Sequence, residues 1–315
     1  AVLAYYRAFM EAFQQKYGSA YASKIPEINI SLGASGELRY PSFNAHDRGL
    51  GGYPTRGAVQ AYSKPAVAAF RAWALRKYGS VGEVNRAWGF SLTHWDQIYP
   101  PTGLGPSDAS SGFFARAEHW SRYGRDFFEF YQESLFTHGT QVVREAVSAF
   151  AKGAFRGIAL GVKVPGVHWR MATDRLAELA AGMIRVDNDW KNYSQGHGYR
   201  PLIGWAAGLR KIPQAPAIYL HFTCLEKDNK EDGAHGQSLA KDLVFWVGAE
   251  AKRQGVTLMG ENALAGPIST DTAWNNIENA LKWSSYSGLT ILRMIDVYQS
   301  ATALRRYQAL IEALK

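Results

Sequence analysis

Five short apolar segments, spread along most of the chain, constrain its fold more than any other feature. Each is rich in β-branched residues or leucine and shows little alternation of polar and apolar positions. That pattern is typical of strands covered on both faces, as in parallel sheets. The predicted strands are residues 25–32, 158–164, 217–223, 256–260 and 289–294.

Helical patterns separate these strands, so the chain is predicted to be of the α/β class. The first expected helix is residues 2–17, which Gly18 ends, and the second begins at a capping box at Ser80 and runs toward Trp88. A long helix is expected over residues 113–150, with an interruption near Gly139. The remaining expected helices are residues 238–254, 274–283 and 302–314. A barrel of eight strands takes about 250 residues, so the length would allow one. Only five strands are recognisable, because residues 33–155 contain loops and helices.

Composition excludes several classes of protein. With 47% hydrophobic and 20% charged residues the chain has an ordinary globular balance. A net charge of +8 without a dense Lys/Arg run indicates a solvated surface, so we expect no nucleic-acid partner. The single cysteine, Cys224, excludes an intrachain disulfide and is predicted to be a buried, inert thiol. We expect no membrane span, no metal site and no cofactor.

Two glutamates stand out at the ends of predicted strands. Glu37 follows Gly36, and Glu261 follows Gly260, far along the chain. The carboxyl ends of parallel barrel strands meet on one face, where barrel enzymes carry their active sites. Two carboxylates flanking a sugar linkage are what glycosidic bond hydrolysis requires. The competing interpretation is that either glutamate is a structural ion-pair partner.

Several motifs, in a fixed order, resemble those of the β-amylases, glycoside hydrolase family fourteen, and in particular the bacterial type. The resemblance covers nearly the whole chain. Its motifs are Gly36-Glu37-Leu38-Arg39-Tyr40-Pro41-Ser42, Val162-Lys163-Val164-Pro165-Gly166-Val167-His168-Trp169, Phe222-Thr223-Cys224-Leu225-Glu226, Gly260-Glu261-Asn262-Ala263-Leu264, Leu292-Arg293, and the region from Lys77 to Gly89. Phe43 departs from the usual tyrosine, and Arg170 and Lys227 replace commoner neighbours.

The resemblance implies a (β/α)8 TIM barrel of which this chain carries the fourth to eighth strands. The first three, including a substrate-contacting aspartate, have no counterpart here. We therefore expect residues 1–315 to form a single catalytic barrel domain that is incomplete at its N-terminus, with no separate starch-binding domain. Five strands leave two open edges, so we expect the chain alone to be poorly stable and weakly active.

The resemblance also assigns roles to residues. Glu37 is expected to be the general acid and must keep its proton, whereas Glu261 is the general base and must be ionised. Arg293 is a candidate cation for holding Glu261 in that state. The expected substrate-binding residues are Lys163, His168, Trp169, Thr223, Asn262, Ala263, Leu264 and Arg293.

Plainer interpretations stay open for several of these residues. Lys163 could belong to a core ion pair, His168 could be a core histidine, and Trp169 could serve packing alone. Thr223 could be an ordinary strand residue instead of orienting the nucleophilic water with Glu261. Glu226 could either support the site or be a surface charge.

The expected function is inverting exo-hydrolysis of α-1,4-glucosidic bonds in starch-type glucans, releasing β-maltose from non-reducing ends. Its partner would be the glucan, and the bacterial likeness implies secretion; the oligomeric state is left open. One alternative is a retaining β-glycosidase of the barrel clan, such as a β-galactosidase. In those enzymes an asparagine usually precedes the acid/base, whereas Gly36 precedes Glu37 here. Another alternative is a non-catalytic or incomplete glucan-binding chain.

Overall fold

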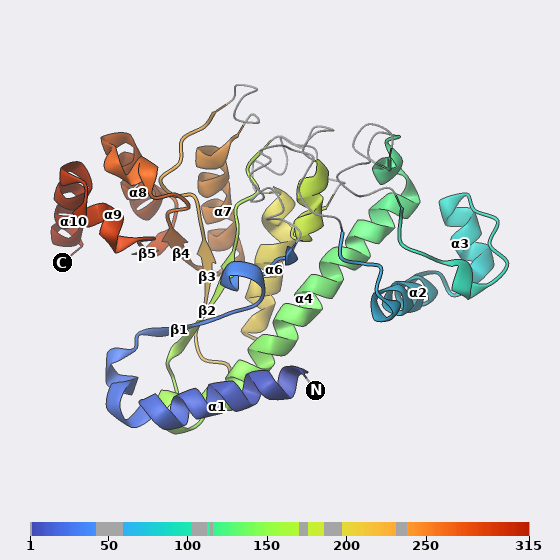
Figure 1. Cartoon of the computed structure of the whole chain (residues 1–315), viewed down its shortest axis with the longest axis horizontal. Coiled ribbons are helices and arrows are strands. Elements are labelled where there is room, and N and C mark those ends of the chain that lie inside the picture. The colour runs from blue at the N-terminus through green and yellow to red at the C-terminus, as the bar shows by residue number, and fades with distance from the viewer. Residues whose placement is uncertain are drawn as a thin grey trace. The chain divides into compact units, whose positions relative to one another are not determined.

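The structure is a computed structural model that describes residues 2–41, 59–102, 112–113, 116–169, 176–185, 197–230 and 238–314 (Figure 1). Its helices are α1 (Val2–Tyr21), α2 (Lys64–Tyr78), α3 (Val81–Trp88), α4 (Arg122–Phe150), α6 (Arg200–Leu209), α7 (Ala240–Gln254), α8 (Asp271–Trp283), α9 (Met294–Tyr298) and α10 (Ala301–Ala313). Its strands are β1 (Glu27–Ile30), β2 (Ala159–Val164), β3 (Ile218–Phe222), β4 (Thr257–Glu261) and β5 (Tyr286–Thr290). Short 3₁₀ turns connect several of them, among them Ala34–Gly36.

The five strands form one parallel sheet in the order β1-β2-β3-β4-β5. Sequence order and spatial order are the same, as in a (β/α) barrel, whereas doubly wound sheets reverse direction at a switch point. Within the described residues β1 and β5 each pair with a strand on one side only. The predicted α/β class with five parallel strands is therefore confirmed.

The chain divides into two compact units. The first comprises Ala1–Leu38, His138–Arg170 and Lys191–Lys315 and contains the whole sheet. Within it α6 packs on β3, α7 on β4 and α8 on β5 (Figure 1). The second comprises Arg39–Thr137 and Met171–Trp190 and contains α2, α3 and the first half of α4.

The expectation of strands covered on both sides holds for β2 and β3, which are buried at almost every position, but not for β1, β4 and β5. Val162, Leu220 and Leu258 lie at matching positions on β2, β3 and β4 and are buried. On the opposite face of the sheet, Lys163 and Glu261 are polar and partly exposed, and His221 between them is polar and buried. We call this second face the polar face; it carries Asn29, Lys163, Tyr219, His221, Met259 and Glu261.

The predicted helices are largely confirmed, with corrections where glycines were taken as stops. Ser80 caps α3 by accepting a hydrogen bond from the Glu83 amide at 3.2 Å, and Gly255 ends α7 in the left-handed region. However, α1 continues past Gly18 to Tyr21, and α4 runs unbroken through Gly139. A β-carbon at Gly139 would lie 2.7 Å from the Trp205 ring, so this glycine permits close packing and does not break the helix.

The last strand lies earlier than predicted. The sequence indicated residues 289–294, but β5 is Tyr286–Thr290 and α9 begins at Met294. Tyr286 is buried and its hydroxyl donates to the Val244 carbonyl at 3.0 Å, a tertiary contact that no local pattern reveals. The helices α2, α6 and α9 were not predicted, although Ser63 and Pro65 are standard helix-start residues and Ser63 does cap α2.

Candidate active site

The turn after β1 directs Glu37 toward the neighbouring strand. Ser35 and Gly36 both have positive φ, 59° and 79°, which bends the backbone sharply before Glu37. A glycine at the second position avoids the steric cost that a side chain would bring there. Beyond the turn Glu37 forms a parallel bridge with Lys163, and the Leu38 amide donates to the Lys163 carbonyl at 2.8 Å.

Glu261 is the last residue of β4, and Gly260 before it is needed for a different reason. A β-carbon at Gly260 would lie 2.1 Å from Cδ2 of Leu225, so only glycine allows the segment after β3 to approach β4 this closely. The Leu225 amide donates to the Glu261 carbonyl at 3.3 Å. Glycine therefore precedes both glutamates, for bending in one case and for close packing in the other.

Lys163 brings the two glutamates into one site. Its Nζ lies 2.9 Å from Oε2 of Glu261, while its backbone is bridged to Glu37. The Lys163 and Glu261 side chains are only 25% and 12% exposed, so solvent screens this pair incompletely.

This contact supplies a cation for Glu261 other than the expected Arg293. Among the described residues the cation beside Glu261 is Lys163, whereas Arg293 is exposed and lies three residues beyond the end of β5, at the start of α9. Lys163 does form an ion pair, as one of the two interpretations of this residue expected. Its partner is the predicted base, and its side chain stays partly exposed. A sugar contact by Lys163 or Arg293 remains a prediction.

The segment after Glu261 is held by two neighbouring strand ends. Asn262 is fully buried and bonds Leu292 beyond β5: its Oδ1 accepts from the Leu292 amide at 2.6 Å, and its Nδ2 donates to the Leu292 carbonyl. The Ala263 and Leu264 amides each donate to the Glu226 carboxylate at 2.9 Å. Leu264, three residues after Glu261, is 49% exposed.

The end of β3 contributes Thr223 and Cys224, both buried. Cys224 has a positive φ of 74°, a conformation that costs energy for a residue with a side chain and is common at functional sites. Burial raises the pKa of its thiol, and the charges of Glu226 and Glu37 add to that shift. The prediction of a buried, inert thiol is confirmed as far as burial is concerned, and the ends of β1 and β3 lie within electrostatic reach of each other.

His168 and Trp169 follow β2. His168 is 3% exposed, its Nδ1 lies 2.6 Å from the Ser238 hydroxyl, and its carbonyl accepts from the Leu239 amide at 2.9 Å. The Trp169 ring is partly exposed, with its centroid 4.0 Å from that of His168. Their proposed glucan contacts stay predictions, as does the role of Thr223.

Some predicted positions lie outside the described residues, namely Ser42, Phe43 and Arg170. Within the described residues no group of three or more His, Cys, Asp or Glu side chains is arranged to hold a metal ion. None of the described helices combines the length and the hydrophobicity needed to cross a bilayer.

Two features of the site were missed by sequence reasoning. Glu226, left open between two roles, is 2% exposed and holds the segment after Glu261. His221 on the polar face pairs with Glu27 at 2.5 Å. An ionisable residue inside or directly after an apolar run was the available signal, since such a group must find a partner when it is buried.

Comparison with known proteins decides which family this site belongs to. The model of Glycosyl hydrolase family 14 matches residues 1–312. The chain belongs to glycosyl hydrolase family 14. Among relatives of this family, the thermophilic beta-amylase of Thermoanaerobacterium thermosulfurigenes is 34% identical over 94% of this chain and 48% of its own length. The beta-amylase of Cytobacillus firmus is 35% identical over 92% of this chain and 55% of its own.

A solved beta-amylase structure shows the same fold. The catalytic domain of the beta-amylase from Paenibacillus polymyxa superimposes with a TM-score of 0.74 at 33% identity, covering 93% of this chain and 62% of that one. The resemblance to bacterial β-amylases is therefore confirmed. The chain spans about half the length of the first two relatives.

Proposed function

We propose that this family 14 chain carries the hydrolytic site for α-1,4-glucosidic bonds of starch-type glucans and releases β-maltose from their non-reducing ends. The observation that carries the proposal is Lys163, whose backbone is bridged to Glu37 and whose ammonium group lies 2.9 Å from Glu261. The names of the relatives, which are beta-amylases, support the substrate class.

In the proposed reaction Glu37 donates its proton to the glycosidic oxygen as the bond to the anomeric carbon breaks. Glu261 takes a proton from a water molecule that attacks the anomeric carbon from the opposite face of the ring. Such a pair leaves room for that water, with carboxyl groups about 6.5–9.5 Å apart. Lys163, whose Nζ lies 2.9 Å from Oε2 of Glu261, helps by holding that carboxylate in place.

Family membership supports this proposal over a retaining β-glycosidase. The two mechanisms give different first products, because inversion at an α-linkage yields a β-anomer. Proton NMR of the sugar released from maltooligosaccharides, recorded before mutarotation, distinguishes them. Release of the α-anomer would exclude the inverting mechanism, and binding of glucan without any hydrolysis would favour the glucan-binding alternative.

Two substitutions test the assignments of the glutamates. Glu37→Gln and Glu261→Gln are each expected to lower kcat at least about 100-fold, the scale of general acid–base catalysis. Glu83→Gln is the control, because Glu83 is an exposed side chain on α3 that pairs with Arg86. Near-normal turnover in either variant would refute the role assigned to that residue.

A further inference from the structure

Glu226 is a buried carboxylate whose contacts are unusually specific. It follows β3, is 2% exposed, and accepts the Ala263 amide on Oε2 and the Leu264 amide on Oε1, both at 2.9 Å. Burial raises the pKa of its carboxyl, and the two backbone donors act in the opposite direction. One side chain thus satisfies two consecutive backbone donors directly after the predicted base and the asparagine that follows it.

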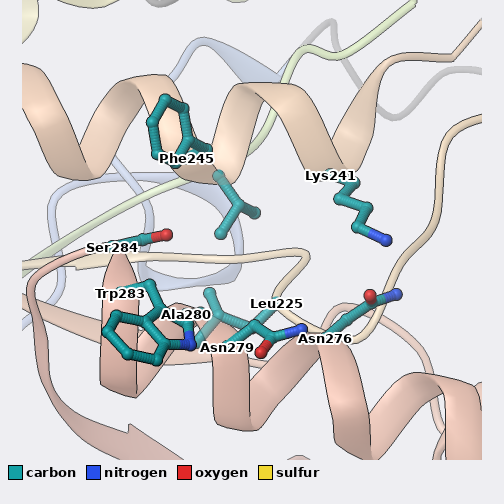
Figure 2. Close-up of a pocket in the computed structure, with 9 residues that line it drawn as sticks. Leu225, Lys241, Phe245, Asn276, Asn279, Ala280, Trp283 and Ser284 are labelled. Atoms are coloured by element: carbon teal, nitrogen blue, oxygen red, sulfur yellow. The ribbon is translucent and has the colours of Figure 1, made fainter.

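Glu226 is itself held in place from α8. The Asn276 side chain donates to the carbonyls of Glu226 and Lys227 at 3.4 and 3.2 Å. Asn276 and Leu225, the neighbour of Glu226 in the chain, line a pocket between α7 and α8 (Figure 2). A helix outside the sheet therefore fixes the backbone of Glu226, and Glu226 fixes the backbone after β4.

These contacts link three strand ends. Glu226 ties the end of β3 to residues 263–264, and Asn262 ties the end of β4 to Leu292 beyond β5. Since the Ala263 and Leu264 amides are already engaged, their donors are not available to a sugar. The segment can meet a glucan through its other groups, such as the half-exposed Leu264 side chain.

We propose that Glu226 is a positioning residue that fixes the backbone of residues 263–264 and thereby the presentation of Glu261 and the segment 262–264 to the glucan. The inference rests on the proposed function for its effect on turnover. The positioning itself can be measured without any substrate. Glu226 acts in the site without contacting the reacting atoms.

The test is Glu226→Gln, which keeps the side-chain shape. A glutamine offers one acceptor oxygen, and its amide nitrogen faces the second backbone donor, which loses its partner. Amide hydrogen exchange of residues 263 and 264 is expected to speed up about tenfold or more. With native far-UV circular dichroism retained, kcat on maltooligosaccharides is expected to fall by about 10- to 100-fold, because small misplacements of reacting groups are costly.

Asp228→Asn is the matched control. Asp228 lies two residues further along, is about half exposed, and pairs with Lys241 at 3.5 Å, so both readouts are expected to stay within about twofold of the unmodified chain. If Glu226→Gln does not fold, Asn276→Ala replaces it. That variant keeps the carboxylate and removes its backbone anchor, so a smaller increase in exchange at residues 263 and 264 is expected.

The outcomes separate this inference from the proposed function. Exchange and kcat both within twofold of the unmodified chain would overturn the positioning role. Faster exchange with unchanged kcat would overturn the link to catalysis. If the unmodified chain shows no glucan hydrolysis, the proposed function fails, while amide exchange in Glu226→Gln still decides whether Glu226 fixes this segment.

Discussion

The close approach of Leu225 to Gly260 makes a sharp prediction about stability. In a Gly260→Ala variant the new β-carbon would lie 2.1 Å from Cδ2 of Leu225 and 3.1 Å from its Cδ1 and Cγ. Leu225 is 1% exposed, so its whole side chain would have to rotate toward the pocket between α7 and α8 (Figure 2). Overpacking of this kind costs about 1–3 kcal/mol in the free energy of unfolding.

The assay is urea-induced unfolding followed by circular dichroism, with Gly208→Ala as the control. Gly208 lies in α6, and no neighbouring atom comes within 4 Å of the position that an alanine methyl group would occupy there. Alanine at this position is therefore expected to stabilise the chain by about 0.5–1 kcal/mol. Leu225→Ala alone is expected to cost about 2–5 kcal/mol by leaving a cavity.

The double variant gives the decisive comparison. Combining Gly260→Ala with Leu225→Ala removes the clash and partly fills the cavity, so the double variant should lose less than the two single variants summed. Additive losses, or a Gly260→Ala variant as stable as the unmodified chain, would refute the packing argument.

Three further predictions follow from other contacts. Lys163→Met removes the ammonium group that lies 2.9 Å from Glu261, so kcat on maltooligosaccharides should fall by about 10- to 100-fold through misplacement of Glu261; a raised KM with unchanged kcat would instead indicate a sugar contact. Asp126→Asn should lower the free energy of unfolding by about 1–3 kcal/mol in urea titration, because the buried carboxylate accepts from Lys77 at 3.0 Å and from Trp88 at 2.8 Å. The raised pKa of Glu226 means that the folded state holds this proton more tightly, so its contribution to stability is complete below the unfolded value of about 4.3 and is lost as pH rises through the folded pKa. The difference in unfolding free energy between the unmodified chain and Glu226→Gln, measured from pH 4 upward in urea, should show that decline.

Local patterns predicted well wherever the deciding interaction is local. The capping serine at position 80 and the stop at Gly255 act within one helical turn, and both are where the sequence placed them. The same reasoning failed at Gly18 and Gly139, which look like helix stops. Their positions are decided by Ala154 and Trp205, residues far away in the sequence that approach the helix too closely for a side chain.

At the candidate site, too, local features were predictable from the sequence and long-range contacts were not. The motifs identified Glu37 and Glu261 as a pair, because glycine before a carboxylate at a strand end is readable from the chain itself. The sequence predicted Arg293 as a cation for Glu261, and it did not predict the ion pair that Lys163 forms with Glu261. Lys163 and Glu261 lie on strands separated by β3, and only the sheet register brings their side chains to 2.9 Å.

The sequence alone determined the alternation of strands and helices and the parallel sheet, and it predicted Glu37 and Glu261 as the catalytic pair. These follow from hydrophobic periodicity and from short motifs, which depend on neighbouring residues. Tertiary structure alone decided that Lys163 contacts Glu261, that Glu226 holds residues 263–264, and that β5 begins at Tyr286. The first two depend on groups from different strands meeting at the carboxyl ends of those strands, where a buried charge or backbone donor must find its partner. The third depends on the contact of Tyr286 with Val244 in α7.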